Sequence, residues 1–419
     1  KSCVKAVDID NDGDLDLFIG GRVLPGSYPQ PVSSFIYRND SKDGVIKFTD
    51  VTNDIAKELK NIGLVCDALW TDFDNDGFTD LIVAGEWMPV TFFKNEKGKL
   101  VNVTNQSGVN TEIGWWNSIV GGDFDNDGDI DYVIGNLGEN SFYRASHEYP
   151  VSIYAKDFDK NKSYDAISTL FLKDPQGAKK EFTAQNRDDI VEQLPALKKK
   201  FLTYKSFADA DFSQLFTKEQ LQDALVLHAN NFKSCLLKNM GGGKFEMHPL
   251  PVQAQFAPLY GMVTDDFNGD GNLDVAICGN DFGTEVTDGR YDALNGLVLS
   301  GDGKGNFTAE SISQSGLYIP GDAKGLIKLK GAGNTYLLAA SQNRGPLKIF
   351  NHAGVNQKLI PLAVNDKTIF ITLTNGQTRK EEIYFGHSFL SQSSSFICTD
   401  PGMKKIEVVN NKGEKRTVQ

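Results

Sequence analysis

Short apolar runs recur through the first two thirds of the chain, and each follows directly after a segment rich in Asp. Residues 17–19, 81–83, 132–134 and 275–277 are such runs, and a Gly follows each within two positions. Continuous apolar runs of this length are typical of buried strands. The pattern therefore predicts that each Asp-rich segment is a loop that joins two strands.

Five Asp-rich segments are nine residues long and share one internal spacing: 8–16, 72–80, 123–131, 157–165 and 266–274. Acidic or amide side chains stand at positions 1, 3, 5 and 9, and Gly stands at position 6 except where Lys162 replaces it. So many carboxylates in one short loop repel one another. Ca²⁺ removes that cost, because it takes six to eight oxygen ligands and suits flexible Asp-rich loops. The alternative interpretation is a solvated acidic turn.

The spacing thus predicts three to five Ca²⁺ ions, with the 157–165 loop the weakest site because it has fewer carboxylates and no Gly. The loops are not EF-hands, since none has Glu at position 12. The predicted side-chain ligands are Asp8, Asp10, Asp12, Asp16, Asp72, Asp74, Asp76, Asp80, Asp123, Asp125, Asp127, Asp131, Asp157, Asp159, Asn161, Asp165, Asp266, Asn268, Asp270 and Asp274.

Each loop belongs to a larger unit of about four strands, and repetition of such units is typical of the blades of an all-β propeller. The pattern predicts six units, at residues 3–52, 64–104, 115–149, 151–250, 257–313 and 322–352. It also predicts a helical insertion at about 186–230, with a break at Pro195 and a capping box at Thr217 to Gln220. Residues 1–357 would form this propeller, and residues 358–419, which lack Asp loops, a small β module.

Charge and cysteine content narrow the classes of function. The net charge is −12, and the five loops carry four ligand carboxylates in each of three and three in each of the others. This concentrated acidity argues against a nucleic-acid partner. The five cysteines include no CxxC pair, although a Cys3–Cys66 bridge stays open. No apolar run has the length of a membrane span, so membrane attachment would need segments outside this chain.

The blade motifs resemble those of the FG-GAP/VCBS repeat family, the calcium-loop propellers typified by integrin α subunits. Residues 15–21 (LDLFIGG) and 79–85 (TDLIVAG) carry the resemblance over roughly residues 1–350. The tail YFGHSFLSQS at 384–393 resembles the ASPIC/UnbV module found after such propellers. The combination is similar to that of cartilage acidic protein and of large surface proteins of Bacteroidota.

The resemblance implies an exported protein, at the cell surface, secreted or periplasmic, and a propeller of seven blades in total. It also implies that the main-chain carbonyl at loop position 7 completes each calcium site. The carbonyls are those of Asp14, Phe78, Asp129, Ser163 and Asn272. For Ser388 and Ser391 beside His387 it implies a structural role rather than nucleophilic chemistry.

The segments that follow the second strand of each unit should emerge on the face opposite the loops. They offer polar groups and one Trp, a combination that suits a glycan or a protein loop; the alternative is that they satisfy loop backbone. We expect a calcium-stabilised binding or scaffold module and no enzyme. The alternative is a polysaccharide lyase, in which Arg22 or Arg344 with a Tyr would act. The candidate ligand residues are Arg22, Glu86, Trp87, Asn136, Asn280 and Arg344.

Overall fold

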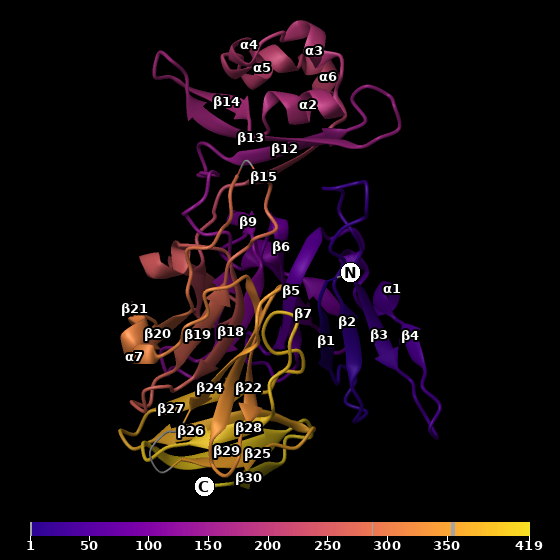
Figure 1. Cartoon of the computed structure of the whole chain (residues 1–419). Coiled ribbons are helices and arrows are strands. Elements are labelled where there is room, and N and C mark those ends of the chain that lie inside the picture. The colour runs from indigo at the N-terminus through magenta and orange to yellow at the C-terminus, as the bar shows by residue number, and fades with distance from the viewer. Residues whose placement is uncertain (1, 287, 353–356) are drawn as a thin grey trace.

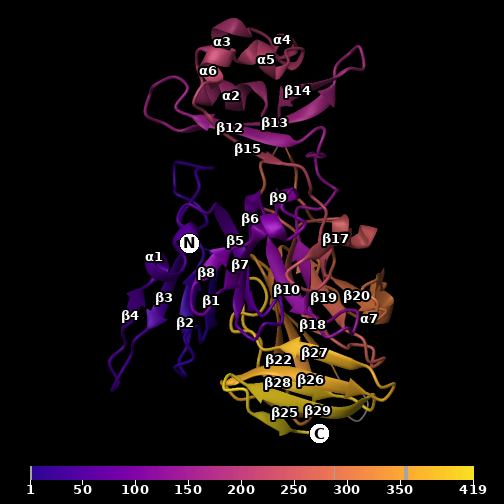
Figure 2. The same ribbon diagram turned by 180° about the vertical axis from the view of Figure 1, so that it is seen from behind.

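The computed structural model describes residues 2–286, 288–352 and 357–419, which form an all-β protein of antiparallel sheets. In Figure 1 an inserted unit lies at one end, a C-terminal module at the other, and five sheets between them. Figure 2 shows the same arrangement from behind. We number these five sheets 1 to 5 in chain order.

Among the described residues, sheets 1 to 4 each have four strands paired in one repeated order, sheet 2 has one strand more, and sheet 5 has three strands. A fifth strand, β9 (Ile113–Trp115), pairs with β6 of sheet 2. Sheet 1 consists of β1 (Val4–Val7), β2 (Asp16–Ile19), β3 (Phe35–Asn39) and β4 (Phe48–Asp50), and the main strands of sheet 2 are β5 (Leu64–Thr71), β6 (Asp80–Pro89), β7 (Thr91–Asn95) and β8 (Leu100–Asn102). Sheet 3 consists of β10 (Ser118–Gly122), β11 (Asp131–Gly135), β16 (Cys235–Asn239) and β17 (Phe245–Pro249), and sheet 4 of β18 (Leu259–Asp265), β19 (Asp274–Gly279), β20 (Leu297–Gly301) and β21 (Phe307–Ala309). Sheet 5 consists of β22 (Ala323–Lys330), β23 (Tyr336–Gln342) and β24 (Lys348–His352).

The first strand of each sheet contacts the first strand of the next, from β1 through β5, β10 and β18 to β22. The first two strands of sheets 2 and 3 are buried almost throughout, which explains why their sequences are continuous apolar runs rather than alternating ones. Short helices α1 (Thr52–Ile55) and α7 (Ile312–Ser315) follow the last strands of sheets 1 and 4.

The prediction that residues 151–250 form a single unit is wrong. The chain leaves sheet 3 after β11 and returns to it as β16, so residues 235–249 complete the third unit. That unit therefore has its full four strands, and the described residues form five sheets in this series where the pattern predicted six units. An Asp loop followed by strands looks the same in any sheet, because periodicity does not specify which strands pair.

The inserted unit consists of a separate sheet, which we call the inserted sheet, and short helices that cover it (Figure 1). Pro195 falls between α2 and α3, and the predicted capping box at Thr217 and Gln220 is present at α6. The strands are β12 (Val151–Lys156), β13 (Asp165–Lys173), β14 (Lys179–Thr183) and β15 (Leu225–Ala229), and the helices are α2 (Arg187–Gln193), α3 (Leu197–Lys200), α4 (Tyr204–Ala208), α5 (Phe212–Leu215) and α6 (Lys218–Leu221).

The C-terminal module is a small β structure, as the alternating pattern indicated. A four-stranded sheet in the order β27–β26–β29–β30 lies beside the pair β25–β28. The strands are β25 (Lys358–Pro361), β26 (Asp366–Leu373), β27 (Thr378–Glu382), β28 (Phe396–Thr399), β29 (Met403–Asn410) and β30 (Lys415–Thr417). Within the described part of the chain, no helix has the length and apolarity needed to span a membrane.

Candidate metal centres

All five Asp loops share one backbone conformation. Positions 4 and 6 have positive φ in every loop, for example 57° at Asn126 and 95° at Gly128. Gly and Asn tolerate this left-handed conformation well. In the inserted sheet Lys160 and Lys162 adopt it instead, at 62° and 72°.

The same set of hydrogen bonds closes every loop. In the 123–131 loop the amide of Gly128 donates to Asp123 at 3.1 Å, and the amide of Asp129 donates to Asp127 at 2.9 Å. The amide of Phe124 donates to Asp131 at 3.3 Å. The 157–165 loop repeats all three bonds, so the change from Gly to Lys162 leaves the loop geometry intact.

The last Asp of each loop in sheets 1 to 4 also holds the third strand of its own sheet. The second oxygen of Asp131 accepts from the amide of Asn239 at 2.7 Å, and that of Asp80 accepts from the amide of Asn95 at 2.7 Å. Asp16 and Asp274 do the same at the ends of β3 and β20. Within the described ranges, Asp165 accepts a single such bond, from the amide of Phe158 at 3.0 Å.

The third strands carry a signal that sequence reasoning missed. Each of β3, β7 and β16 ends in a basic residue followed by Asn, at 38–39, 94–95 and 238–239. The main-chain amide of each Asn donates a hydrogen bond to the position-9 carboxylate of the loop. The side chain of Asn239 donates to the carbonyls of Phe73 and Ile130. This pair in residues 235–239 marks β16 as a third strand, but it does not specify the sheet to which the strand belongs.

The carboxylates of four loops converge closely enough to hold a metal ion. Their oxygens lie within 4.8 Å of one another in the groups Asp8, Asp10 and Asp16; Asp72, Asp74 and Asp80; Asp123, Asp125 and Asp127; and Asp157, Asp159 and Asp165. Buried oxygens of Asp8, Asp14 and Asp125 have no hydrogen-bond partner among the described residues. An all-oxygen set with unpartnered lone pairs suits a hard cation such as Ca²⁺. The residues present therefore fit the predicted metal.

Burial makes these loops electrostatically unfavourable without a cation. Removal from water raises the pKa of Asp80 and of Asp131 to about 8 and that of Asp123 to about 7, and the neighbouring Asp side chains add to the shift. Lysines neutralise part of the charge, since Lys238 lies 2.8 Å from Asp125 and Lys94 bridges Asp74 and Asp76.

The C-terminal module contacts each of the four loops of sheets 1 to 4. The amide of Lys380 donates to Asp123 at 2.9 Å, and the side chain of Asn411 donates to Asp8 at 2.8 Å. Lys367 and Arg379 donate to the carbonyls of Gly77 and Gly271 at 2.8 and 2.7 Å. The module therefore covers the end of the sheets that carries the predicted metal sites, whereas the 157–165 loop lies on the inserted unit at the other end (Figure 1).

Residues 382–395, which we call the axial segment, run from this module along the first strands of all five sheets. Glu382 accepts from Thr71 of β5, the carbonyl of Phe385 accepts from Ala6 of β1, and the side chain of Tyr384 lies against Gly121 of β10. The amide of Met262 in β18 donates to Ser388, and the amide of Ser394 donates to the carbonyl of Lys328 in β22.

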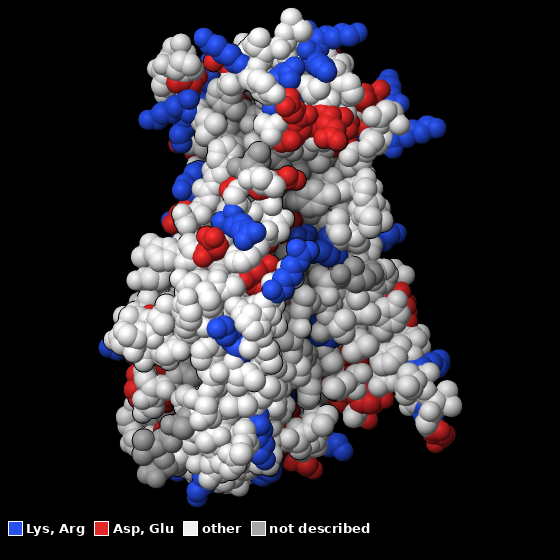
Figure 3. All heavy atoms as spheres, in the orientation of Figure 1, with Lys and Arg blue, Asp and Glu red and all other residues white. Residues whose placement is uncertain are grey.

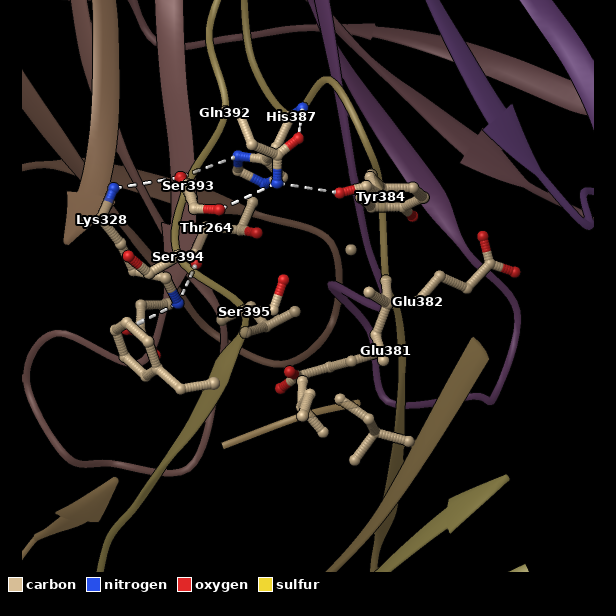
Figure 4. A pocket seen from close by; sticks show the side chains of 18 residues that line it. Thr264, Lys328, Glu381, Glu382, Tyr384, His387, Gln392, Ser393, Ser394 and Ser395 are labelled. Carbon is tan, nitrogen blue, oxygen red and sulfur yellow. Dashed lines mark hydrogen bonds and ion pairs between the residues drawn. The ribbon is translucent and has the colours of Figure 1, made fainter. Parts of the chain in front are cut away.

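Figure 4 shows the small cavity of about 90 Å³ beside the axial segment, with Tyr384, His387, Gln392 and Ser393 around it. Burial and the nearby Lys328 and Lys5 lower the pKa of His387 to about 3. The hydroxyl of Ser391 donates to the carbonyl of His387 at 3.4 Å. Both hydroxyls that the sequence singled out, Ser388 and Ser391, are thus engaged with backbone.

The opposite ends of the sheets hold the candidate ligand residues. Arg22 and Glu86 form an ion pair, and Arg344 is exposed. Asn136 and Asn280 are fully buried and hydrogen-bond loop backbone. Trp87 is 6% exposed and donates to the hydroxyl of Tyr28 at 2.7 Å, so it belongs to the core rather than to an open binding surface. Whether the accessible members bind a ligand stays a prediction.

Comparison with known proteins finds a family model that matches a part of the chain with two of the Asp loops. The model of an FG-GAP-like repeat matches residues 72–134, from the first Asp of the second loop to the fourth residue of β11. The match therefore includes two complete Asp loops and the strands that follow them. Comparison with curated proteins gives no match.

Proposed function

We propose that the chain is a calcium-stabilised binding or scaffold module of an exported protein. Sheets 1 to 5 would be blades of an integrin-α-like propeller, and the C-terminal module would be of the ASPIC/UnbV type. An FG-GAP-like repeat is typical of extracellular binding modules and commonly binds calcium. In this proposal the ligand is a glycan or a protein on the face opposite the four loops of sheets 1 to 4.

One observation carries the proposal: four successive sheets use the same buried carboxylate, at loop position 9, to join the loop to the third strand. A cation held by the loop would keep this carboxylate, which is itself a predicted ligand, in its charged form. Calcium bound to the native state alone then stabilises the fold by mass action, by about 2.7 kcal/mol for each site at a hundredfold excess over Kd.

The test is thermal melting in EGTA and in millimolar Ca²⁺, together with elemental analysis of the purified protein. We expect bound calcium and a midpoint several degrees higher with Ca²⁺. Mg²⁺ at the same concentration is the control, since it demands a smaller octahedral site and should stabilise less. An unchanged midpoint in a protein without bound metal would end the proposal.

We favour binding over a polysaccharide lyase because Arg22, one of the two candidate charge neutralisers, is already paired with Glu86. A lyase also needs a base within reach of its substrate. Incubation with acidic polysaccharides and detection of newly formed unsaturated ends tests this alternative directly. Product formation that scales with protein concentration would favour the enzyme.

A further inference from the structure

A cavity of about 230 Å³ opens at the ends of sheets 2 to 4 that face away from their Asp loops. Strands β6, β11 and β19 begin at the loops. Glu86 lies in the second half of β6, and Leu137 and Asp281 lie two residues beyond the ends of β11 and β19. All three line this cavity. It is thus a concave site distinct from the predicted metal centres.

Aromatic side chains form much of its wall. Trp115 packs edge-on against Tyr143, with ring centroids 5.2 Å apart. Tyr260 and Tyr291 also line the cavity. The indole nitrogen of Trp115 is buried and has no hydrogen-bond partner in the part of the chain that the structure describes. The ammonium of Lys324 lies 3.6 Å from the centroid of the Tyr260 ring, so this ring already holds a cation of the chain itself. The rings of Trp115, Tyr143 and Tyr291 are left for a ligand.

Four carboxylates surround these rings, and two of them have a positively charged partner among the described residues. Glu86 pairs with Arg22, and Asp281 accepts from the hydroxyl of Tyr260 at 3.0 Å with Lys324 3.5 Å away. Among the described residues, Glu285 and Asp288 have no ion-pair partner. Burial and the nearby Glu285 and Asp189 raise the pKa of Asp288, as an excess of negative charge would.

We propose that this cavity binds an ammonium group, with the aromatic rings as its walls and Glu285 and Asp288 as its counter-charges. Aromatic faces and carboxylates both attract a cation, and the attraction to the rings is larger where water is excluded. The same charges repel an acidic polysaccharide. The inference rests on the proposed function in placing the ligand on this face, and it narrows the ligand to a cationic one.

The experiment uses the whole chain at saturating Ca²⁺ and measures binding by calorimetry and by the fluorescence of Trp115 and its neighbours. The probes are choline and cadaverine as free ammonium compounds, and the amide of Nα-acetyl-lysine as a protein side chain. The neutral isostere 3,3-dimethylbutan-1-ol is the matched control for choline. We expect at least one ammonium probe to bind saturably and at least tenfold more tightly than the isostere. The tightest probe then distinguishes a small molecule from a lysine side chain.

Variants separate the counter-charges from the walls. We expect Asp288→Asn and Glu285→Gln each to weaken binding about fivefold, and Glu96→Gln, the same change at an exposed turn outside the cavity, to leave it unchanged. Tyr143→Leu should weaken binding, whereas Tyr143→Phe, which keeps the ring, should not. Equal binding of choline and the isostere, or no binding of any probe, would overturn the inference. Either result would leave the calcium stabilisation of the proposed function untouched.

Discussion

The nine-residue Asp motif occurs in two settings, and the difference between them separates what a loop encodes locally from what its surroundings add. In sheets 1 to 4 and in the inserted sheet, positions 4 and 6 have the same left-handed backbone and the same three hydrogen bonds close the loop. Even Lys162 adopts the conformation that Gly128 adopts. The loop geometry is therefore local.

The surroundings differ in two respects. In sheets 1 to 4 the position-9 carboxylate also accepts from the third strand, and the C-terminal module covers the loop. Among the described residues, the 157–165 loop of the inserted sheet lacks the second bond, and the inserted unit lies at the end of the molecule away from the C-terminal module (Figure 1). The same motif thus carries much of the sheet structure in one setting and little in the other.

The contribution of the surroundings is tested most directly by removing the position-9 carboxylate in each setting. Asp131→Ala leaves the buried amides of Phe124 and Asn239 without acceptors, so we expect a loss of about 3 kcal/mol in the free energy of unfolding. Asp165→Ala leaves one amide without its acceptor and should cost about 1 kcal/mol. Thermal melting at saturating Ca²⁺ measures both. Equal losses would show that the bond to the third strand adds nothing.

The second comparison is at position 5, where Asp127 and Asn161 each accept from the amide two residues on. Asp127→Ala removes a charged ligand and leaves three carboxylates that repel one another, so we expect a loss of about 1–3 kcal/mol. Asn161→Ala removes only an amide and should cost less. The dependence of the midpoint on Ca²⁺ concentration should shift for Asp127→Ala alone, and binding on the opposite face should survive in it.

Much of this organisation was predictable because it depends on short-range spacing. The five loops, the apolar strands after them, the break at Pro195 and the capping box at Thr217 all follow from residues within a few positions of one another. The return of the chain to sheet 3 is a pairing across about a hundred residues, which periodicity does not report. The Lys238–Asn239 pair marks β16 as a third strand but does not say with which strand it pairs.

The candidate ligand face was harder to predict for a related reason. The sequence does not show whether a polar or aromatic residue after a strand faces solvent or interacts with the loop backbone and the core. Asn136 and Asn280 satisfy loop backbone, and Trp87 packs against Trp115 with centroids 5.0 Å apart. Trp87→Ala should therefore leave a cavity and lower the melting midpoint, contrary to the expectation that this residue is an exposed contact.

Acidification should destabilise the native protein in part through His387 of the axial segment. The pKa of His387 is about 3 in the native protein, below its ordinary 6.5, so at pH between these values only the unfolded chain takes up the proton. The stability that this neutral His contributes is therefore lost as the pH falls from about 6.5 towards 3. We expect the melting midpoint of His387→Gln to fall less over this range than that of the unmodified protein. Parallel curves would show that His387 has no such role.

The smallest effect tests whether the loop backbone is strained where a Lys has replaced Gly. Lys162 holds a φ of 72°, which costs a residue with a Cβ about 1 kcal/mol relative to Gly. Because the bonds around Lys162 match those around Gly128, Lys162→Gly should relieve that cost and stabilise the inserted unit, partly offset by the greater freedom of Gly in the unfolded chain. Gly128→Ala should have the opposite sign, since open space around Gly128 leaves backbone strain as the main penalty. Hydrogen exchange in the two loops measures both changes locally. If Lys162→Gly loosens its loop as Gly128→Ala loosens its own, the two loops do not share one conformational requirement.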